Sequence, residues 1–282
     1  MGRRGLIMNK IKLVTDSSAN LTEFTGIDFA AAPLKIQTAE KQYVDTRELD
    51  VHKMVNDLYS YSGKSSTSCP NTSDWLAAFG DAKEIVCFTI TSALSGSYNS
   101  ALTAKRQYEE AYPSRRVVVV DTRSAGPEIV LMAEKAARMI SEGYSLDEIK
   151  AALDSYKTEL LFVLESMKNL ANNGRISKIA AAAAGILGVR AIGKASDEGT
   201  LEMLSKCRGS SRVSADFIGH MTDMGYRGGK ARIAHCMNEQ LAKQLRGRLL
   251  TLFPDAQIVI EECRGLCSFY AEKGGMLVGF EV

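Results

Sequence analysis

Residues 85–111, IVCFTITSALSGSYNSALTAKRQYEEA, decide the fold of this chain. The apolar run 85–91 predicts a strand, and the run 98–111 predicts a helix. Between them, Leu94-Ser95-Gly96-Ser97-Tyr98 carries small hydroxyl residues where the strand leads into the helix. Such a turn leaves backbone N–H groups and hydroxyls directed at one spot, and a helix N-terminus favours negative charge. The stretch therefore predicts an anion-binding turn suited to a phosphate or a carboxylate.

The same alternation of strand and helix extends on both sides of this stretch. Strand-like runs lie at 12–15, 31–36, 85–90 and 117–121, and helix-like runs at 51–59, 74–82, 98–111 and 128–141. Strands that are apolar throughout are buried on both faces, and their alternation with helices predicts right-handed crossovers in a mostly parallel sheet. We therefore predict an N-terminal doubly wound α/β domain. Its binding edge is expected at the carboxyl ends of the strands, near Asp16, 92–97 and 121–124.

The second half of the chain has a different pattern. Ser145 and Glu148 form a capping box that opens a helix, a short helix leads to Leu170, and Asp197-Glu198-Gly199 predicts a hairpin. Further strands are expected at 160–164, 189–194, 200–204, 231–235, 256–262, 267–270 and 276–280, and helices at 212–224 and 238–252. This mixture predicts a C-terminal α+β domain. We expect the domain boundary between 155 and 165, which divides the chain into 1–160 and 161–282.

Composition excludes several classes of function. The 282 residues include 35 basic and 33 acidic side chains, and a net charge of +2 provides no electrostatic footprint for nucleic acid. No apolar run reaches membrane-span length and residues 1–10 lack a signal-peptide core, so we expect a soluble, cytoplasmic protein. The six cysteines never occur as C-x-x-C, which predicts free thiols and neither a zinc site nor a redox pair. His52, His220 and His235 match no metal-ligand spacing.

Two further polar segments accompany the anion-binding turn. Pro70 favours an extended residue before it in Thr67-Ser68-Cys69-Pro70, and such hydroxyls usually bond to their own backbone. Gly174 predicts a positive φ that directs the Arg175 side chain back over the domain, and an exposed arginine at a helix start is the alternative. The segments below occur in a characteristic order: Val14-Thr15-Asp16-Ser17-Ser18, Thr67-Ser68-Cys69-Pro70, Leu94-Ser95-Gly96-Ser97-Tyr98 and Asn173-Gly174-Arg175-Ile176.

In this order and spacing, the four segments resemble the DegV family of bacterial fatty-acid-binding proteins, and the resemblance covers nearly the whole chain. It implies that one long-chain fatty acid lies in an apolar tunnel between the domains. It also implies that the protein is a carrier, with the fatty acid as its ligand and no cofactor. A separate ATP-dependent kinase subunit would convert the carried acid to acyl-phosphate for phospholipid synthesis. The chain lacks the G-x-x-x-x-G-K-[ST] phosphate loop, which agrees with a carrier that has no ATP site.

The resemblance also assigns the site residues. It implies carboxylate contacts from Thr67, Ser68, Ser95, Gly96, Ser97 and Tyr270, with Arg175 near the head group or the kinase surface. Cys69, Ser97, Asn173 and Lys273 stand where the family has glutamine, threonine, glycine and proline. Tyr270 replaces a histidine, which is the largest departure. A tyrosine hydroxyl hydrogen-bonds a carboxylate but carries no charge near neutral pH, so it does not supply the charge that a histidine can carry.

The residues leave other interpretations open. Ser95 alone fits a helix N-cap, and a nucleophile is disfavoured because the G-x-S-x-G elbow is absent and no histidine is placed as its base. Asp16 and Asp121, each at the end of a strand, are predicted to cap the helix that follows. The alternative functions are an α/β enzyme acting on a small phosphorylated metabolite, with one of these aspartates as acid or base, and a lipid binder without kinase coupling. The five alanines at 180–184 are expected in a packed helix rather than along the tunnel.

Overall fold

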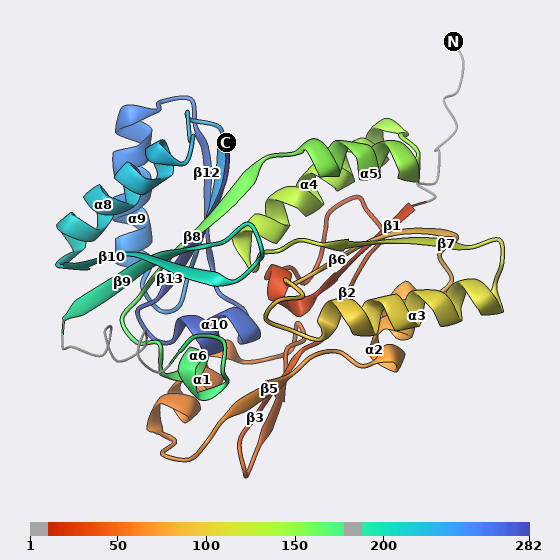
Figure 1. Ribbon diagram of the computed structural model, residues 1–282, viewed down its shortest axis with the longest axis horizontal. Coiled ribbons are helices and arrows are strands. Elements are labelled where there is room, and N and C mark those ends of the chain that lie inside the picture. Colours follow the sequence, from red (N-terminus) through yellow and green to blue (C-terminus); the bar gives the residue numbers. More distant parts are fainter. Residues whose placement is uncertain (1–10, 178–187) are drawn as a thin grey trace.

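Four parallel strands form the N-terminal sheet of the computed structural model, which describes residues 11–177 and 188–282. Their spatial order is β2 (Phe29–Ala32), β1 (Ile11–Asp16), β6 (Glu84–Thr89) and β7 (Arg116–Asp121). One face is covered by α2 (Thr72–Phe79) and α3 (Ser97–Ala111), and the other by α4 (Pro127–Glu142) and α5 (Leu146–Ser155) (Figure 1). The predicted doubly wound parallel sheet is confirmed.

Alternate residues along these strands supply two separate cores. Leu13, Val86 and Phe88 pack toward α4 and α5, whereas Val14 and Cys87 pack toward α2 and α3. All five are completely buried, as expected for strands with helices on both faces. Apolar side chains on both faces of the strands therefore account for the layered arrangement.

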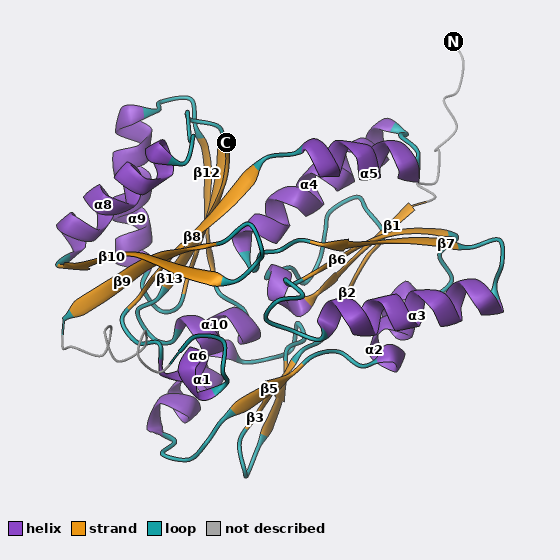
Figure 2. Ribbon diagram, in the orientation of Figure 1, coloured by secondary structure: helices purple, strands orange, loops and turns teal. Residues whose placement is uncertain are grey.

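Six strands form the C-terminal sheet, which is mixed. Their order is β10 (Leu201–Arg208), β9 (Val189–Ala195), β8 (Thr158–Leu164), β13 (Met276–Glu281), β11 (Lys230–His235) and β12 (Gln257–Glu262). Only the β11–β12 pair is parallel, and β9–β10 is the predicted hairpin. Helices α8 (Ser210–Asp223) and α9 (Glu239–Leu252) cover one face (Figure 2). The expected α+β half is confirmed.

Helix α4 lies between the two large sheets and contacts strands of both. It begins with Pro127 and ends at Gly143, whose φ of 86° suits a glycine C-cap. Its first turn passes very close to β13, because an ideal Cβ on Gly279 would lie 2.5 Å from the backbone nitrogen of Glu128. The predicted capping box of the next helix, α5, is also present, with Ser145 and Glu148 exchanging side-chain contacts with each other's backbone.

A third, three-stranded antiparallel sheet was not predicted. Its order is β4 (Gln42–Val44), β3 (Lys35–Gln37) and β5 (Ser66–Ser68), and α1 (Val51–Ser60) follows β4 along the chain. The single strand predicted at 31–36 is wrong, because the chain leaves the first sheet at Ala32 and enters the third at Lys35. Pro33 lies between them and has no N–H for a strand ladder.

The strand predicted at 267–270 is also wrong, since α10 (Gly265–Ala271) occupies this segment. Both oxygens of the Asp45 carboxylate accept backbone N–H groups of the first helical turn, from Gly265 at 2.9 Å and from Leu266 at 2.8 Å. An acid more than two hundred residues upstream therefore caps this helix. Helix α10 packs beside the short, predicted helix α6 (Lys168–Asn172). No helix of the described residues is long and apolar enough to cross a membrane.

Candidate functional site

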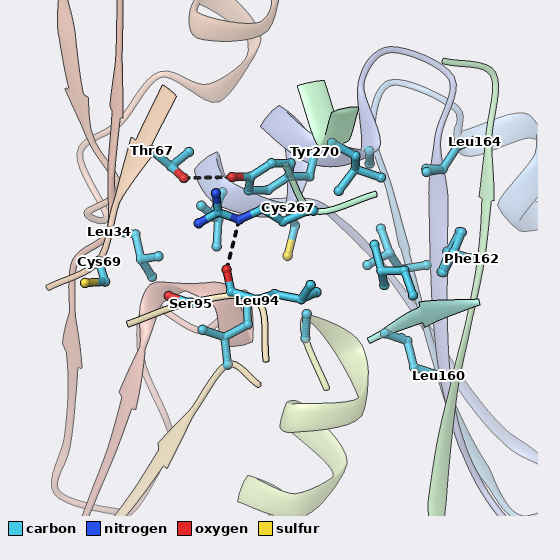
Figure 3. Close-up of a pocket in the computed structure, with 18 of the residues that line it drawn as sticks. Leu34, Thr67, Cys69, Leu94, Ser95, Leu160, Phe162, Leu164, Cys267 and Tyr270 are labelled. Atoms are coloured by element: carbon cyan, nitrogen blue, oxygen red, sulfur yellow. Dashed lines mark hydrogen bonds between the residues drawn. The ribbon is translucent and has the colours of Figure 1, made fainter. Parts of the chain in front are cut away.

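An elongated cavity of about 280 Å³ lies between the N-terminal sheet and the inner face of the six-stranded sheet. Its size is near the lower end of the range for small-molecule pockets, roughly 300–1,000 Å³. The side chains at one end are polar, and those along the remaining wall are almost all apolar (Figure 3). The cavity therefore suits an elongated ligand with one polar end.

The apolar wall combines elements from both halves of the chain. It is lined by Leu34, Ile90, Leu94, Ala125, Leu160, Phe162, Leu164, Leu170, Leu201, Leu266, Cys267, Ala271 and Leu277. Leu160, Phe162 and Leu164 alternate along β8 and face the cavity together (Figure 3). Leu161 and Val163 point to the opposite face, into the core under α8 and α9. All five residues 160–164 are apolar, so the sequence alone did not show which of them face the cavity.

The polar end brings together the segments that the sequence analysis singled out. Thr67 and Ser68 come from β5, Ser95 and Gly96 from the turn before α3, and Tyr270 from α10. Thr67 Oγ1 and the Tyr270 hydroxyl share a hydrogen bond of 2.8 Å (Figure 3). Burial raises the pKa of Tyr270, against the opposing effects of Thr67 and Arg175. Tyr270 is therefore a neutral hydrogen-bonding group at this end of the cavity.

The turn before α3 has the features of an anion site. Gly96 is the N-cap and provides no side chain to close the helix end, and no acidic residue lies in the first turn. An ideal Cβ on Gly96 would lie 3.3 Å from the Cys69 sulfur, so glycine permits the close approach of the residue that follows β5 to this turn. Ser95 Oγ accepts the backbone N–H of Ser97 at 3.3 Å. The fifteen-residue helix thus directs the positive end of its dipole toward the polar end of the cavity.

Ser97 departs from its predicted role. It is completely buried and does not line the cavity, and its hydroxyl donates to Asp16 Oδ2 at 2.6 Å. The predicted direct contact with a ligand carboxylate therefore does not fit this side chain, because its hydroxyl donates its hydrogen bond to the buried aspartate. Asp16 acts as predicted, because it caps the short 3-10 helix that follows β1. The prediction for Asp121 is wrong: it accepts the backbone N–H groups of Ser92 and Arg123, and Gly126 is the N-cap of the next helix, α4.

Arg175 lies at the edge of the polar end. Gly174 has a φ of 72°, which confirms the predicted left-handed position. The Arg175 side chain turns back over the cavity, where Nε donates to the carbonyl of Leu94 at 2.9 Å and a terminal nitrogen donates to the carbonyl of Asn173. No carboxylate of the described residues is within salt-bridge distance of it. The guanidinium charge is therefore available beside the turn before α3.

The remaining predicted features lie elsewhere. His52 pairs with Glu262 at 3.0 Å, His220 contacts Ser205, and His235 is buried beside Asn238. Within 11–177 and 188–282, no group of three or more His, Cys, Asp or Glu side chains is arranged to hold a metal ion. All six cysteines are free thiols. The alanines at 180–184 lie outside the described residues. The wall residue Cys267 was not predicted, because no local pattern distinguishes it.

An apolar cavity closed by hydroxyls, a helix N-terminus and an arginine defines a binding protein for an amphipathic ligand with an anionic head. A family model described as "Uncharacterised protein, DegV family" matches residues 10–281. The chain therefore belongs to the DegV family, as its sequence segments predicted.

Relatives of known sequence and structure resemble this chain along almost its whole length. A DegV domain-containing protein of Streptococcus pneumoniae is 41% identical over 277 residues, which cover 96% of this chain and 99% of that protein. The crystal structure of a DegV family protein from Eubacterium eligens, loaded with heptadecanoic acid, has a TM-score of 0.95 and 41% identity, and the match covers 96% of this chain and 99% of the other. The fatty acid kinase (Fak) B3 protein of Streptococcus pneumoniae, loaded with linoleic acid, has a TM-score of 0.94, with the same identity and coverage.

Proposed function

We propose that this chain binds one long-chain fatty acid and presents its carboxylate to a separate ATP-dependent kinase. The observation that carries the proposal is the distribution of polar groups in this cavity. Its wall is apolar along its length and polar at the end where Thr67, Ser95 and Tyr270 lie. Solved relatives carry heptadecanoic and linoleic acids, which are ligands of this shape. In the proposed complex, the acyl chain lies along β8 and the carboxylate lies at the N-terminus of α3.

The acyl tail and the carboxylate head are expected to contribute different amounts to the free energy of binding. Each buried methylene contributes about 0.8 kcal/mol, so a chain of about fourteen methylenes provides about 11 kcal/mol before ordering costs. A hydrogen bond to a charged group contributes about 1.5–3 kcal/mol. The tail therefore determines affinity, and the head-group contacts determine where the carboxylate lies.

Presentation to a kinase is supported by the position of Arg175. Its guanidinium is partly exposed, has no carboxylate partner in the described structure and lies beside the turn that holds the proposed head group. A positive charge there would stabilise the charge that develops on a transferred phosphoryl group. We assign ATP binding to the partner, and cytoplasmic action to the complex because ATP is consumed there. The similarity to a protein named for fatty acid kinase supports this assignment.

We place the boundary between the two functional halves just before β8. This strand begins at Thr158 and belongs wholly to the six-stranded sheet, so a cut at the expected residue 160 would divide it. A boundary at 156–157 leaves the polar lining residues Thr67, Ser68, Ser95 and Gly96 in the first half. Arg175 and Tyr270 belong to the second half. The tail wall then comes mainly from the second half.

The proposal is tested by extracting the ligand. Protein purified from a bacterial host, denatured and extracted with solvent should yield about one long-chain fatty acid per chain by mass spectrometry. Delipidated protein should be stabilised by palmitate or oleate, by about 2.7 kcal/mol at one hundred times the dissociation constant. Absence of lipid together with absence of stabilisation would refute the carrier. Turnover of a phosphorylated metabolite by the isolated chain, abolished in Asp16→Asn, would support an enzyme instead.

A further inference from the structure

Asp16 is completely buried at the end of β1 and does not line the cavity. Its Oδ2 accepts the backbone N–H of Ile90 at 2.9 Å and the hydroxyl of Ser97 at 2.6 Å. These two residues stand at the beginning and end of the segment that carries Ser95. One carboxylate oxygen therefore holds both ends of the segment 90–97, which we call the head-group turn, without lining the cavity.

The second oxygen of this carboxylate is also occupied. Oδ1 accepts the backbone N–H of Ser18 at 3.2 Å and the Ser18 hydroxyl. Four donors thus converge on two oxygens, and an ionised carboxylate accepts at both oxygens without donating. The amide of an asparagine would turn its NH₂ toward one pair of donors and leave a buried N–H opposed by another N–H. Burial raises the pKa of Asp16, and the donors from Ser18, Ser97 and Ile90 oppose that rise.

The turn that follows Asp16 holds other parts of the cavity wall. Ser17 Oγ accepts the backbone N–H of Leu34 at 3.0 Å. The Ser18 carbonyl accepts the backbone N–H of Gly126 at 2.9 Å and the thiol of Cys267 at 3.3 Å. Leu34 and Cys267 line the cavity, and Gly126 follows the lining residue Ala125. The turn after β1 therefore connects three further segments of the wall without touching the ligand space.

We propose that Asp16 is the positioning residue of the head-group site. By clamping Ile90 and Ser97, it holds Ser95 and the N-terminus of α3 where they meet an anionic head. The inference rests on the proposed function and deepens it, because it assigns the preference for a carboxylate over a neutral head to a residue that never contacts the lipid. Loss of the clamp reduces this preference and leaves the affinity for the tail unchanged.

The test compares two ligands with the same tail. Dissociation constants for palmitate and for hexadecanol are measured by calorimetry on the full, delipidated chain, and the ratio of alcohol to acid gives the preference. In Asp16→Asn and in Ser97→Ala, the ratio should fall by about ten-fold or more, since one contact to a charged group is misplaced. Binding of hexadecanol should change by less than about two-fold. Ser97→Thr retains the hydroxyl and should restore the ratio.

A matched control separates this role from a general loss of structure. Ser205→Ala removes a hydroxyl that contacts His220 at 3.0 Å on β10, and it should leave both constants unchanged. Equal weakening of both ligands in Asp16→Asn and Ser97→Ala would overturn the positioning role, as would an unchanged ratio. If Asp16→Asn does not fold, Ser97→Ala decides the question alone. A wild-type chain that binds neither ligand, or does not prefer the acid, would instead refute the proposed function itself.

Discussion

Removing one hydroxyl from the head-group end should shift fatty-acid affinity by a constant amount at every chain length. Thr67→Val keeps the shape of the side chain and deletes the group that lies 2.8 Å from the Tyr270 hydroxyl. Loss of one hydrogen bond to a carboxylate costs about 1.5–3 kcal/mol, which is about 10–150-fold in the dissociation constant. No other part of the cavity wall changes.

The tail should contribute separately from the head. Each added methylene contributes about 0.8 kcal/mol, or about four-fold in affinity, until the cavity is filled. Binding free energy plotted against carbon number, from laurate to stearate, should therefore give parallel lines for wild type and Thr67→Val. Leu164→Trp narrows the apolar wall instead, so it should reduce the slope for the longer acids.

The assay is calorimetric titration of delipidated protein at fixed pH and salt. Thr251→Val is the matched control, because this exposed threonine lies on α9 and its hydroxyl donates to the carbonyl of Gly247 in the same helix. It should reproduce the wild-type line. A change of slope in Thr67→Val, or no offset between its line and the wild-type line, would refute the division of binding between a polar end and an apolar wall.

Three further predictions concern charge and pH. Arg175→Ala should leave fatty-acid affinity nearly unchanged, because a partly exposed guanidinium adds little, but should slow acyl-phosphate formation with a cognate kinase and ATP; equal rates would argue against its role. Tyr270→His restores the residue of the family pattern and should keep or raise that coupled rate, and a complete loss of rate would contradict this expectation. Burial raises the pKa of Glu128 to about 7, against Ser124 and Thr158, so the folded state holds its proton more tightly than the unfolded chain does. Stability should fall by about 3 kcal/mol from pH 4.5 to 7, and urea unfolding of Glu128→Gln should lack this component.

The N-terminal sheet was predictable because its signals are local. Continuous apolar strands and periodic helices occupy separate stretches of sequence, and the connections between them permit essentially one handedness. The capping box at Ser145 and Glu148 needs only four consecutive residues. The positive φ of Gly174 is likewise a property of its own position.

The errors occur where a distant residue decides the local structure. The segment 267–270 is apolar and short, so its own pattern does not distinguish a strand from a helix. Asp45 supplies the N-terminal cap that makes it helical. In the same way, β5 forms because β3 pairs with it, with Ile36 opposite Thr67.

From the residues alone, the sequence predicted an anion-binding turn at Ser95 and Gly96, where small hydroxyl residues and a glycine precede a helix. The role of Thr67 came only from the family resemblance, since hydroxyls in such a turn usually bond to their own backbone. Only the tertiary structure decided which of these groups face the cavity. It turned Ser97 away to the buried Asp16 and brought Tyr270 to Thr67 across 203 residues. The physical reason is that a residue's type sets which bonds it makes, whereas packing between distant segments sets its partners.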